Sequence, residues 1–420
     1  MSSTPPDLTT PDPSAAEAPS LGELARVFLR ISLLGFGGPN AHIALMLDEV
    51  VEEKGWLTQE HFLQLVGVTN LLPGPNSSEV AIHIGYVKRG WRGALTTGLS
   101  FLAPTFLLVV LFSSLYFRFG TLPQVEGLFW GLKPAVLAII LAAGWKLARV
   151  AVGAGSATPH GSLAFPKGLP FLLAFAGVGT SLLLDRWEVA AMAVGGILGW
   201  RFLRGTREGV EVEAKGIGDG PEVHPPSRRS LVLLPVSAAI LPGLASPLAQ
   251  LFGLTLGAGA VLFGGGYMLV ALLEPFVVGA YGWLSPQEFL DGIALTQAVP
   301  GPIVTLVAFV GFAVAGVPGA AVATAGIYIP SFAAVLLVAP ALDRWRDRTG
   351  VAAALKGVNA VVAGAILGVG FTLIPSAVGD LWGSLIAMIA LLALVKFKVK
   401  AIWVVLGGIC AGLIHIALVA

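Results

Sequence analysis

Charged residues are scarce in this chain. Only 12% of its 420 residues are Asp, Glu, Lys or Arg, whereas 56% are apolar. Soluble domains carry roughly 25% charged residues, so this composition predicts a membrane protein with several spans in the lipid bilayer. The formal net charge is +1, and a chain without basic excess offers no broad surface for nucleic acid.

Cysteine is almost absent as well. The one cysteine, Cys410, lies in an apolar run and excludes an intramolecular disulfide or a CxxC metal site. The chain also lacks the HExxH and GxSxG motifs, a pair of buried aspartates and a Cys/His set. We therefore expect no enzyme activity, no catalytic residue, no metal and no cofactor.

Apolar stretches of membrane-spanning length fill most of the chain. Residues 1–20 are rich in Ser, Thr, Pro and Ala and predict a disordered tail. A first repeat at 21–203 then contains about six spans, and a polar linker at 204–229 follows. We expect a connecting span at 230–248 and a second repeat of about six spans at 249–420. The predicted spans of the first repeat are 24–46, 59–88, 94–117, 128–148, 168–184 and 188–203.

The two halves repeat each other at a constant offset. Several motifs recur 227 positions later, and a fixed offset across many motifs predicts a duplication. The matching motifs are Phe36-Gly37-Gly38 with Phe263-Gly264-Gly265, Trp56-Leu57 with Trp283-Leu284, and Pro73-Gly74-Pro75 with Pro300-Gly301-Pro302. After one deletion the offset becomes 226 and pairs Pro104 with Pro330.

Basic residues suggest that the two copies face opposite ways. Short cytoplasmic loops collect Lys and Arg, and these follow the even-numbered spans of the first half but odd-numbered spans of the second. We therefore predict an all-α polytopic membrane protein with a cytoplasmic N-terminus and about 13 transmembrane helices in two inverted-topology repeats. The basic clusters that decide this are Lys88-Arg89, Lys146 to Arg149, Arg201 to Arg207, Arg344 to Arg348 and Lys396 to Lys400.

Two Pro-Gly-Pro motifs interrupt apolar segments. Proline removes a backbone donor and clashes with the preceding turn, so each motif ends one helix and begins another. Interrupted helices at matching positions of two halves are typical of a transporter's binding site near the bilayer midplane. We expect the interrupted helices to meet at the interface between the repeats.

These motifs resemble those of the chromate ion transporter (CHR) family in its long, two-domain form. The resemblance covers roughly residues 20 to 420 and rests on Phe36 to His42, Leu72 to Pro75, Phe263 to Tyr267 and Gln297 to Pro302. It implies a multi-pass carrier of the inner (plasma) membrane that exports chromate, confers chromate resistance and is sensitive to sulfate. The sequence is compatible with a homodimer and does not determine the oligomeric state.

The motifs suit a tetrahedral oxyanion. A helix that begins after Pro75 would direct free N–H groups toward the ion, and helix N-termini carry roughly +0.5 charge. Close helix packing, or a simple kink, is the alternative interpretation of the glycines and prolines. The candidate substrate-binding residues are Gly37, Gly38, Pro39, Asn40, Asn70, Pro73, Gly74, Pro75, Asn76, Ser77, Ser78, Lys133, Gly264, Gly265, Gly266, Gln297, Pro300, Gly301 and Pro302.

Charged and titratable residues inside the spans are further candidates. Lys133 is the clearest basic one, although it could instead reach the membrane interface from a span end. For proton coupling we name Glu79, His42 and His83. Asn70 and Gln297 pair across the repeat and could bind either ligand or backbone. For each histidine taken alone, the residue type favours a hydrogen-bonded packing role.

The membrane potential favours export of an anion. Moving a charge through about 100 mV is worth roughly 2.3 kcal/mol, so a dianion leaving a negative interior gains roughly 4.6 kcal/mol. Chromate export by alternating access, driven by the potential and/or a proton gradient, is the function that we expect. A transporter for sulfate or another small anion, or an anion channel, is the alternative.

Overall fold

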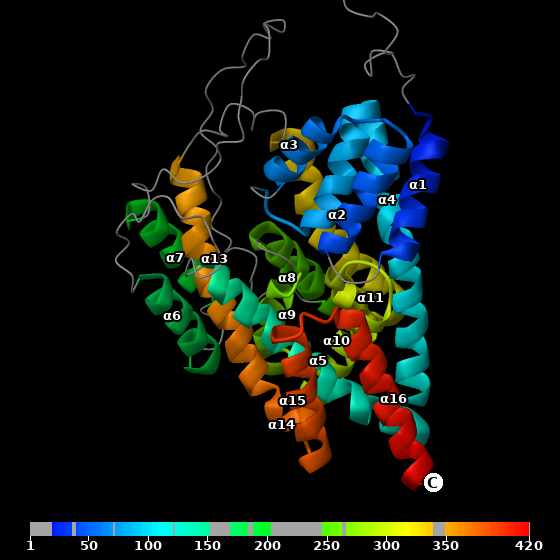
Figure 1. Cartoon of the computed structure of the whole chain (residues 1–420), viewed down its shortest axis with the longest axis vertical. Helices are drawn as coiled ribbons and strands as arrows, with labels where there is room; N and C mark the ends of the chain where they lie inside the picture. Colours follow the sequence, from blue (N-terminus) through cyan, green and yellow to red (C-terminus); the bar gives the residue numbers. More distant parts are fainter. Residues whose placement is uncertain are drawn as a thin grey trace, which may run out of the picture.

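The computed structural model describes residues 19–35, 39–69, 72–120, 122–151, 169–183, 188–202, 246–262, 266–338 and 349–419. Within these ranges the protein is built from helices and has no strand (Figure 1). Four of the described helices are long and apolar enough to cross a membrane. The prediction of an all-α membrane protein is therefore confirmed. The predicted linker 204–229, most of the tail 1–20 and most of the span 230–248 lie outside the described residues.

The first membrane segment folds back on itself. It comprises α1 (Leu21–Leu34), α2 (Pro39–Leu47) and the π-helical segment η2 (Asp48–Glu53). Arg30 Nη1 lies 3.0 Å from Glu49 Oε1, and Lys54 Nζ lies 3.3 Å from Glu23 Oε1. These two ion pairs bring the end of η2 beside the start of α1. The stretch 24–46, which we predicted as one span, is therefore part of a helical hairpin. The predicted count of 13 spans treated this stretch as a single crossing of the membrane.

The next helices are α3 (Gln59–Thr69) and α4 (Asn76–Phe119), and α4 reverses direction inside its length. Gly90 has φ 58° and ψ −150°, a left-handed conformation that glycine adopts without a Cβ clash. The Thr97 hydroxyl donates to the Ala81 carbonyl at 2.8 Å, which requires antiparallel arms. We call residues 76–88 the short arm and residues 91–119 the long arm of α4. The prediction of separate stretches ending at 88 and beginning at 94 agrees with this reversal.

The second half repeats this arrangement. Its elements are α8 (Pro247–Val261), α9 (Met268–Glu274), η4 (Pro275–Ala280), α10 (Pro286–Ala298), η5 (Ile303–Thr305), α11 (Leu306–Ala333) and η6 (Ala334–Val338). Helix α11 reverses at Gly316, with φ 60° and ψ −145°. Gly316 lies 226 positions after Gly90 and has almost the same backbone conformation. The duplication read from the motifs is therefore visible in the backbone.

The remaining described helices form contacts between the two halves. They are α5 (Pro123–Ala151), α6 (Leu169–Leu183), α7 (Glu188–Phe202), α13 (Thr349–Thr372), α14 (Ile374–Ala377), α15 (Leu381–Val395) and α16 (Ala401–Val419). Helices α6 and α7 pack on α13, whereas α15 and α16 pack on α5. The last two helices of each half thus pack against a helix of the other half. Small residues allow this close approach, since a side chain on Gly131 would collide with the Gly408 carbonyl oxygen.

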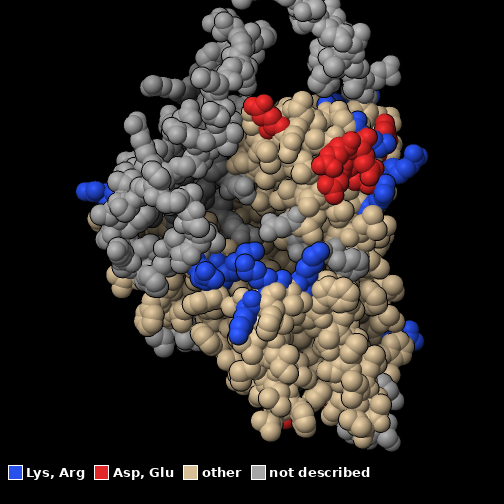
Figure 2. Space-filling view, in the orientation of Figure 1, with Lys and Arg blue, Asp and Glu red and all other residues tan. Residues whose placement is uncertain are grey.

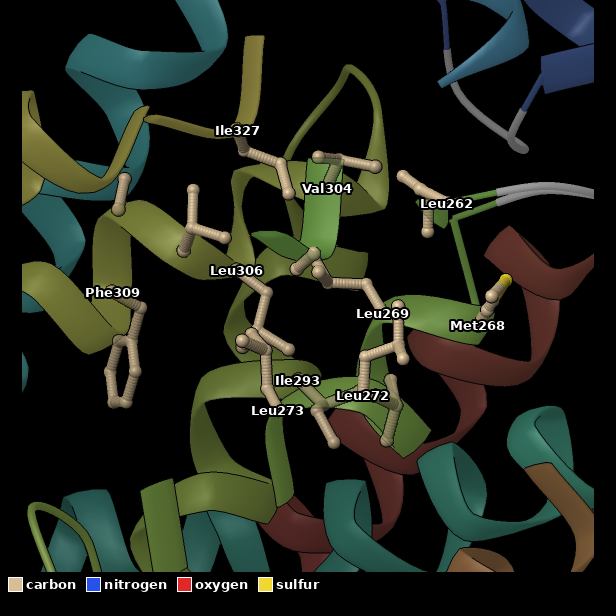
Figure 3. Packing of buried hydrophobic residues seen from close by; sticks show 14 of the residues in the cluster. Leu262, Met268, Leu269, Leu272, Leu273, Ile293, Val304, Leu306, Phe309 and Ile327 are labelled. Carbon is tan, nitrogen blue, oxygen red and sulfur yellow. The ribbon is translucent and has the colours of Figure 1, made fainter. Parts of the chain in front are cut away.

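Buried apolar side chains hold the second half together. Figure 3 shows leucine and isoleucine side chains of α9 to α11 pointing toward one another, with Phe309 to one side. Leu269, Leu306 and Phe309 are completely buried in this cluster. Figure 1 places α1 to α3 at the upper end of the molecule and α14 to α16 at the lower end. Figure 2 shows acidic side chains gathered at the upper end, a row of basic side chains across the middle and a wide uncharged surface at the lower end.

Candidate functional site

The interrupted segments of the two halves meet and exchange backbone hydrogen bonds. The Gly74 N–H donates to the Leu262 carbonyl at 2.6 Å, and the Gly301 N–H donates to the Gly35 carbonyl at 3.1 Å. Gly74 and Gly301 are equivalent in the repeat, as are Gly35 and Leu262. Each Pro-Gly-Pro motif is therefore bonded to the first break of the other half. Each motif thus contacts the half to which it does not belong.

Both central glycines are required by their surroundings. Gly74 has φ 146° and Gly301 has φ 123°, a range in which L side chains are strained. A Cβ on Gly74 would collide with Ser331 Oγ and Glu79 Oε1, and one on Gly301 would collide with Thr105 Oγ1. The Thr105 hydroxyl donates to the Pro300 carbonyl at 2.9 Å. Each Pro-Gly-Pro motif thus faces a hydroxyl residue of the other half, which is Ser331 on α11 for Gly74 and Thr105 on α4 for Gly301.

The start of α4 carries buried polar groups with unused hydrogen-bonding capacity. Ser77, Ser78 and Glu79 are at most 1% exposed, and Pro75 precedes the helix without a side-chain cap. Among the described residues, the Ser77 hydroxyl, both Glu79 carboxyl oxygens and the Ser331 hydroxyl have no hydrogen-bond partner. The Tyr328 hydroxyl faces Ser78. Buried polar groups are normally satisfied, so this cluster holds hydrogen-bonding capacity that the described residues leave unused. We call these five residues the break pocket.

The equivalent helix start in the second half is apolar. Ile303 and Val304 occupy the positions of Asn76 and Ser77, and both side chains are buried. The Thr305 hydroxyl donates to the Pro302 carbonyl at 2.8 Å and is therefore used locally. The unpartnered polar groups are concentrated at the α4 start, where the second half contributes Tyr328 and Ser331. Sequence reasoning missed these two residues because their hydroxyls lie in an ordinary apolar helix.

The other predicted site residues have varied surroundings. Pro39 and Asn40 begin α2, and Gly266 packs on Ile303 before α9. Gln297 donates to the Tyr267 hydroxyl at 2.9 Å and so bonds within its own half. Gly37, Gly38, Asn70, Gly264 and Gly265 lie outside the described residues.

The two candidate histidines differ in place. His42 is fully buried, packs on Gly35 and meets Phe101 edge-on, with ring centroids 5.1 Å apart. It therefore lies at the break that bonds Gly301. His83 is on the short arm of α4, about one turn beyond Glu79, and is only partly buried.

Lys133 lies in a second polar cluster, separate from the break pocket. Its Nζ is 3.2 Å from Asp291 Oδ1, and the Tyr116 hydroxyl donates to Asp291 Oδ2 at 2.7 Å. The side chains of Lys133 and Asp291 are 15% and 7% exposed. Lys133, predicted as a substrate ligand, is thus bound to a carboxylate in this structure. Asp291 was missed, although an acid within the apolar sequence of the second repeat was a signal for it.

Comparison with known proteins gives one consistent result. The family model described as "Chromate transporter" matches residues 22–200 and 249–413. The chain is 32% identical over 397 residues to the chromate transport protein of Cupriavidus metallidurans, covering 94% of this chain and 93% of that protein. It is 30% identical over 381 residues to the probable chromate transport protein of Synechococcus elongatus, covering 91% of each. No solved structure matches the chain.

Proposed function

Because the chain belongs to the chromate transporter family, we propose that it is a secondary transporter that exports chromate from the cytoplasm. The observation that carries the proposal is the break pocket, where buried hydroxyls with no partner among the described residues lie at a helix N-terminus. Helix N-termini attract anions through their free N–H groups and their partial positive charge. Ser77, Ser78, Tyr328 and Ser331 would replace the water around the oxyanion.

Alternating access requires two halves that can rock against each other, and we propose inverted-topology repeats. The contacts of the long arm of α4 support this. Just before the long arm begins, Arg89 donates to the Pro19 carbonyl at 2.7 Å beside α1, and midway along the arm the Thr105 hydroxyl donates to the Pro300 carbonyl. At its end, Tyr116 bonds Asp291 and Phe117 packs on Phe309. The long arm of α4 therefore runs from α1 of the first half, past Pro300, to α10 and the start of α11. The second half thus extends from its Pro-Gly-Pro motif in the direction away from α1, as expected for copies of opposite orientation.

The direction of transport follows from charge. A cytoplasmic N-terminus in the inner membrane accords with the basic loops. The negative interior then drives an anion outward, with roughly 2.3 kcal/mol per charge at about 100 mV. The break pocket lies where both halves contribute groups, so rocking of the halves could expose it to either side in turn. Sulfate is the second candidate substrate, because the same N–H and hydroxyl donors suit any tetrahedral oxyanion.

Flux in proteoliposomes tests this function. We expect saturable chromate transport that accelerates with an outward-directed driving potential, and a several-fold higher KM for Ser77→Ala. Ser113→Ala is the matched control, because Ser113 is a completely buried serine of the same helix whose hydroxyl also has no partner among the described residues. It should behave like the wild type. Non-saturating flux would indicate a channel, and flux of sulfate but not of chromate would reassign the substrate.

A further inference from the structure

The break pocket contains an acid where an anion is proposed to bind. Glu79 is completely buried, and its Oε1 lies at the position that a Gly74 side chain would occupy, beside Ser331 Oγ. No Lys, Arg or His of the described chain forms an ion pair with it. Two negative groups without a cation repel each other strongly in a low-dielectric interior. Glu79 and an oxyanion therefore cannot both occupy the pocket as full anions.

No basic side chain of the described residues is paired with Glu79. The short arm of α4 carries His83 about one turn beyond Glu79, Tyr328 on α11 faces the neighbouring Ser78, and His42 on α2 lies at the Gly35 break. Charged residues on the neighbouring elements are engaged or distant along their helices: Arg30 is paired with Glu49, Asp291 is paired with Lys133, and Glu60 and His61 are at the far end of α3. A proton is thus the available means of removing the charge of Glu79.

We propose that Glu79 is an internal competitor for the anion pocket, so that each oxyanion binds together with one proton and is carried with it. This rests on the proposed transport function. In the empty carrier the ionised carboxylate uses the positive start of its own helix, as any anion would. A proton from the cytoplasm neutralises Glu79, and the oxyanion takes its place. On the other side both leave, and the ionised carboxylate refills the pocket for the return.

The stoichiometry has a measurable consequence. A dianion that travels with one proton moves one net charge, so the potential acts on the wild type with half the strength expected for chromate alone. Apparent affinity should fall as pH rises, by up to tenfold per pH unit once Glu79 is ionised in the empty pocket. A neutral glutamine cannot compete with the anion and binds no proton.

Comparison of the wild type with Glu79→Gln in proteoliposomes tests the proposal. From the zero-flux potential we expect one net charge per chromate for the wild type and two for Glu79→Gln. The KM for chromate should rise with pH more steeply in the wild type, and because both proteins meet the same solution, the titration of chromate itself cancels. Glu49→Gln is the control. Glu49 is also a buried acid, but it lies away from the break pocket and is paired with Arg30.

The outcomes separate the two proposals. Equal charge and equal pH dependence in the wild type and Glu79→Gln would overturn the role of Glu79 while leaving chromate transport intact. Absence of chromate flux in the wild type would instead reject the transport function. If Glu79→Gln does not fold, Ser331→Ala provides a second measurement: it keeps the acid, so the single net charge and the steep pH dependence should remain while the KM rises. Two net charges in Ser331→Ala would also contradict the proposal.

Discussion

Two buried acids of this protein have opposite surroundings. Asp291 is held by Lys133 and by the Tyr116 hydroxyl, whereas Glu79 has no partner among the described residues. Burial of a carboxylate costs free energy unless the carboxylate is paired. The structure pairs one of these two acids and leaves the other unpaired among the described residues. Asp291 is compensated in the resting structure. Glu79 leaves its compensation to a proton.

The repeat sharpens this contrast, because neither acid has an acidic equivalent in the other half. Position 306, which matches Glu79, is Leu306. The equivalents of Asp291 and Lys133 are Gln64 and Asn359, two neutral amides. The two halves therefore share a backbone arrangement but differ in their buried charges. The break pocket depends on the first half for its acid, and the paired cluster depends on the second.

The largest effect on stability is expected from Lys133→Ala. Removing one partner of a buried ion pair leaves an uncompensated carboxylate, which costs about 3–5 kcal/mol of unfolding free energy. Thermal unfolding in detergent should show a large loss, and the double variant Lys133→Ala with Asp291→Asn should recover much of it. A double variant as unstable as the single one would mean that packing of the lysine, and not its charge, stabilises this region.

A smaller loss is expected from Tyr116→Phe. This change removes one hydrogen bond to a charged group and keeps the ring that packs on Phe117 and Phe309, so it should cost about 1.5–3 kcal/mol. The same unfolding measurement checks it. In an Asp291→Asn background the cost of Tyr116→Phe should shrink, because the acceptor is then neutral. An unchanged cost would place the role of Tyr116 in packing.

The smallest effect on stability is expected from Glu79→Gln. No ion pair or hydrogen bond of the carboxyl group is lost, so the unfolding free energy should stay the same or rise by less than about 1 kcal/mol. Only transport should change. If Glu79→Gln destabilised the protein as much as Lys133→Ala, Glu79 would have to be a structural acid like Asp291, and the difference between the two clusters would disappear.

Local signals in the chain were sufficient for much of this molecule. Apolar runs identified a helical membrane protein, and the offset of 227 positions identified equivalent residues in the two halves. The backbone hydrogen bonds of Gly74 and Gly301 join such equivalent positions. Proline and glycine act on their own turn, which is why the breaks could be located from sequence. The helix start at Asn76 and the burial of Glu79 followed from the same local logic.

Other features required the tertiary structure. The hairpin at 24–46 was predicted as one span, because an apolar run of that length does not reveal whether it crosses or returns. Lys133 and Asp291 are 158 positions apart, and only the packing of α5 against α10 brings them together. Tyr328 and Ser331 joined the break pocket because α11 passes the α4 start.

What the sequence alone determined was the class of protein, its duplication and the sites where its helices stop, since these depend on neighbours within one or two turns. The tertiary structure alone decided which buried charges are satisfied and which are not. That decision rests on contacts between distant segments, whose mutual position no local pattern encodes.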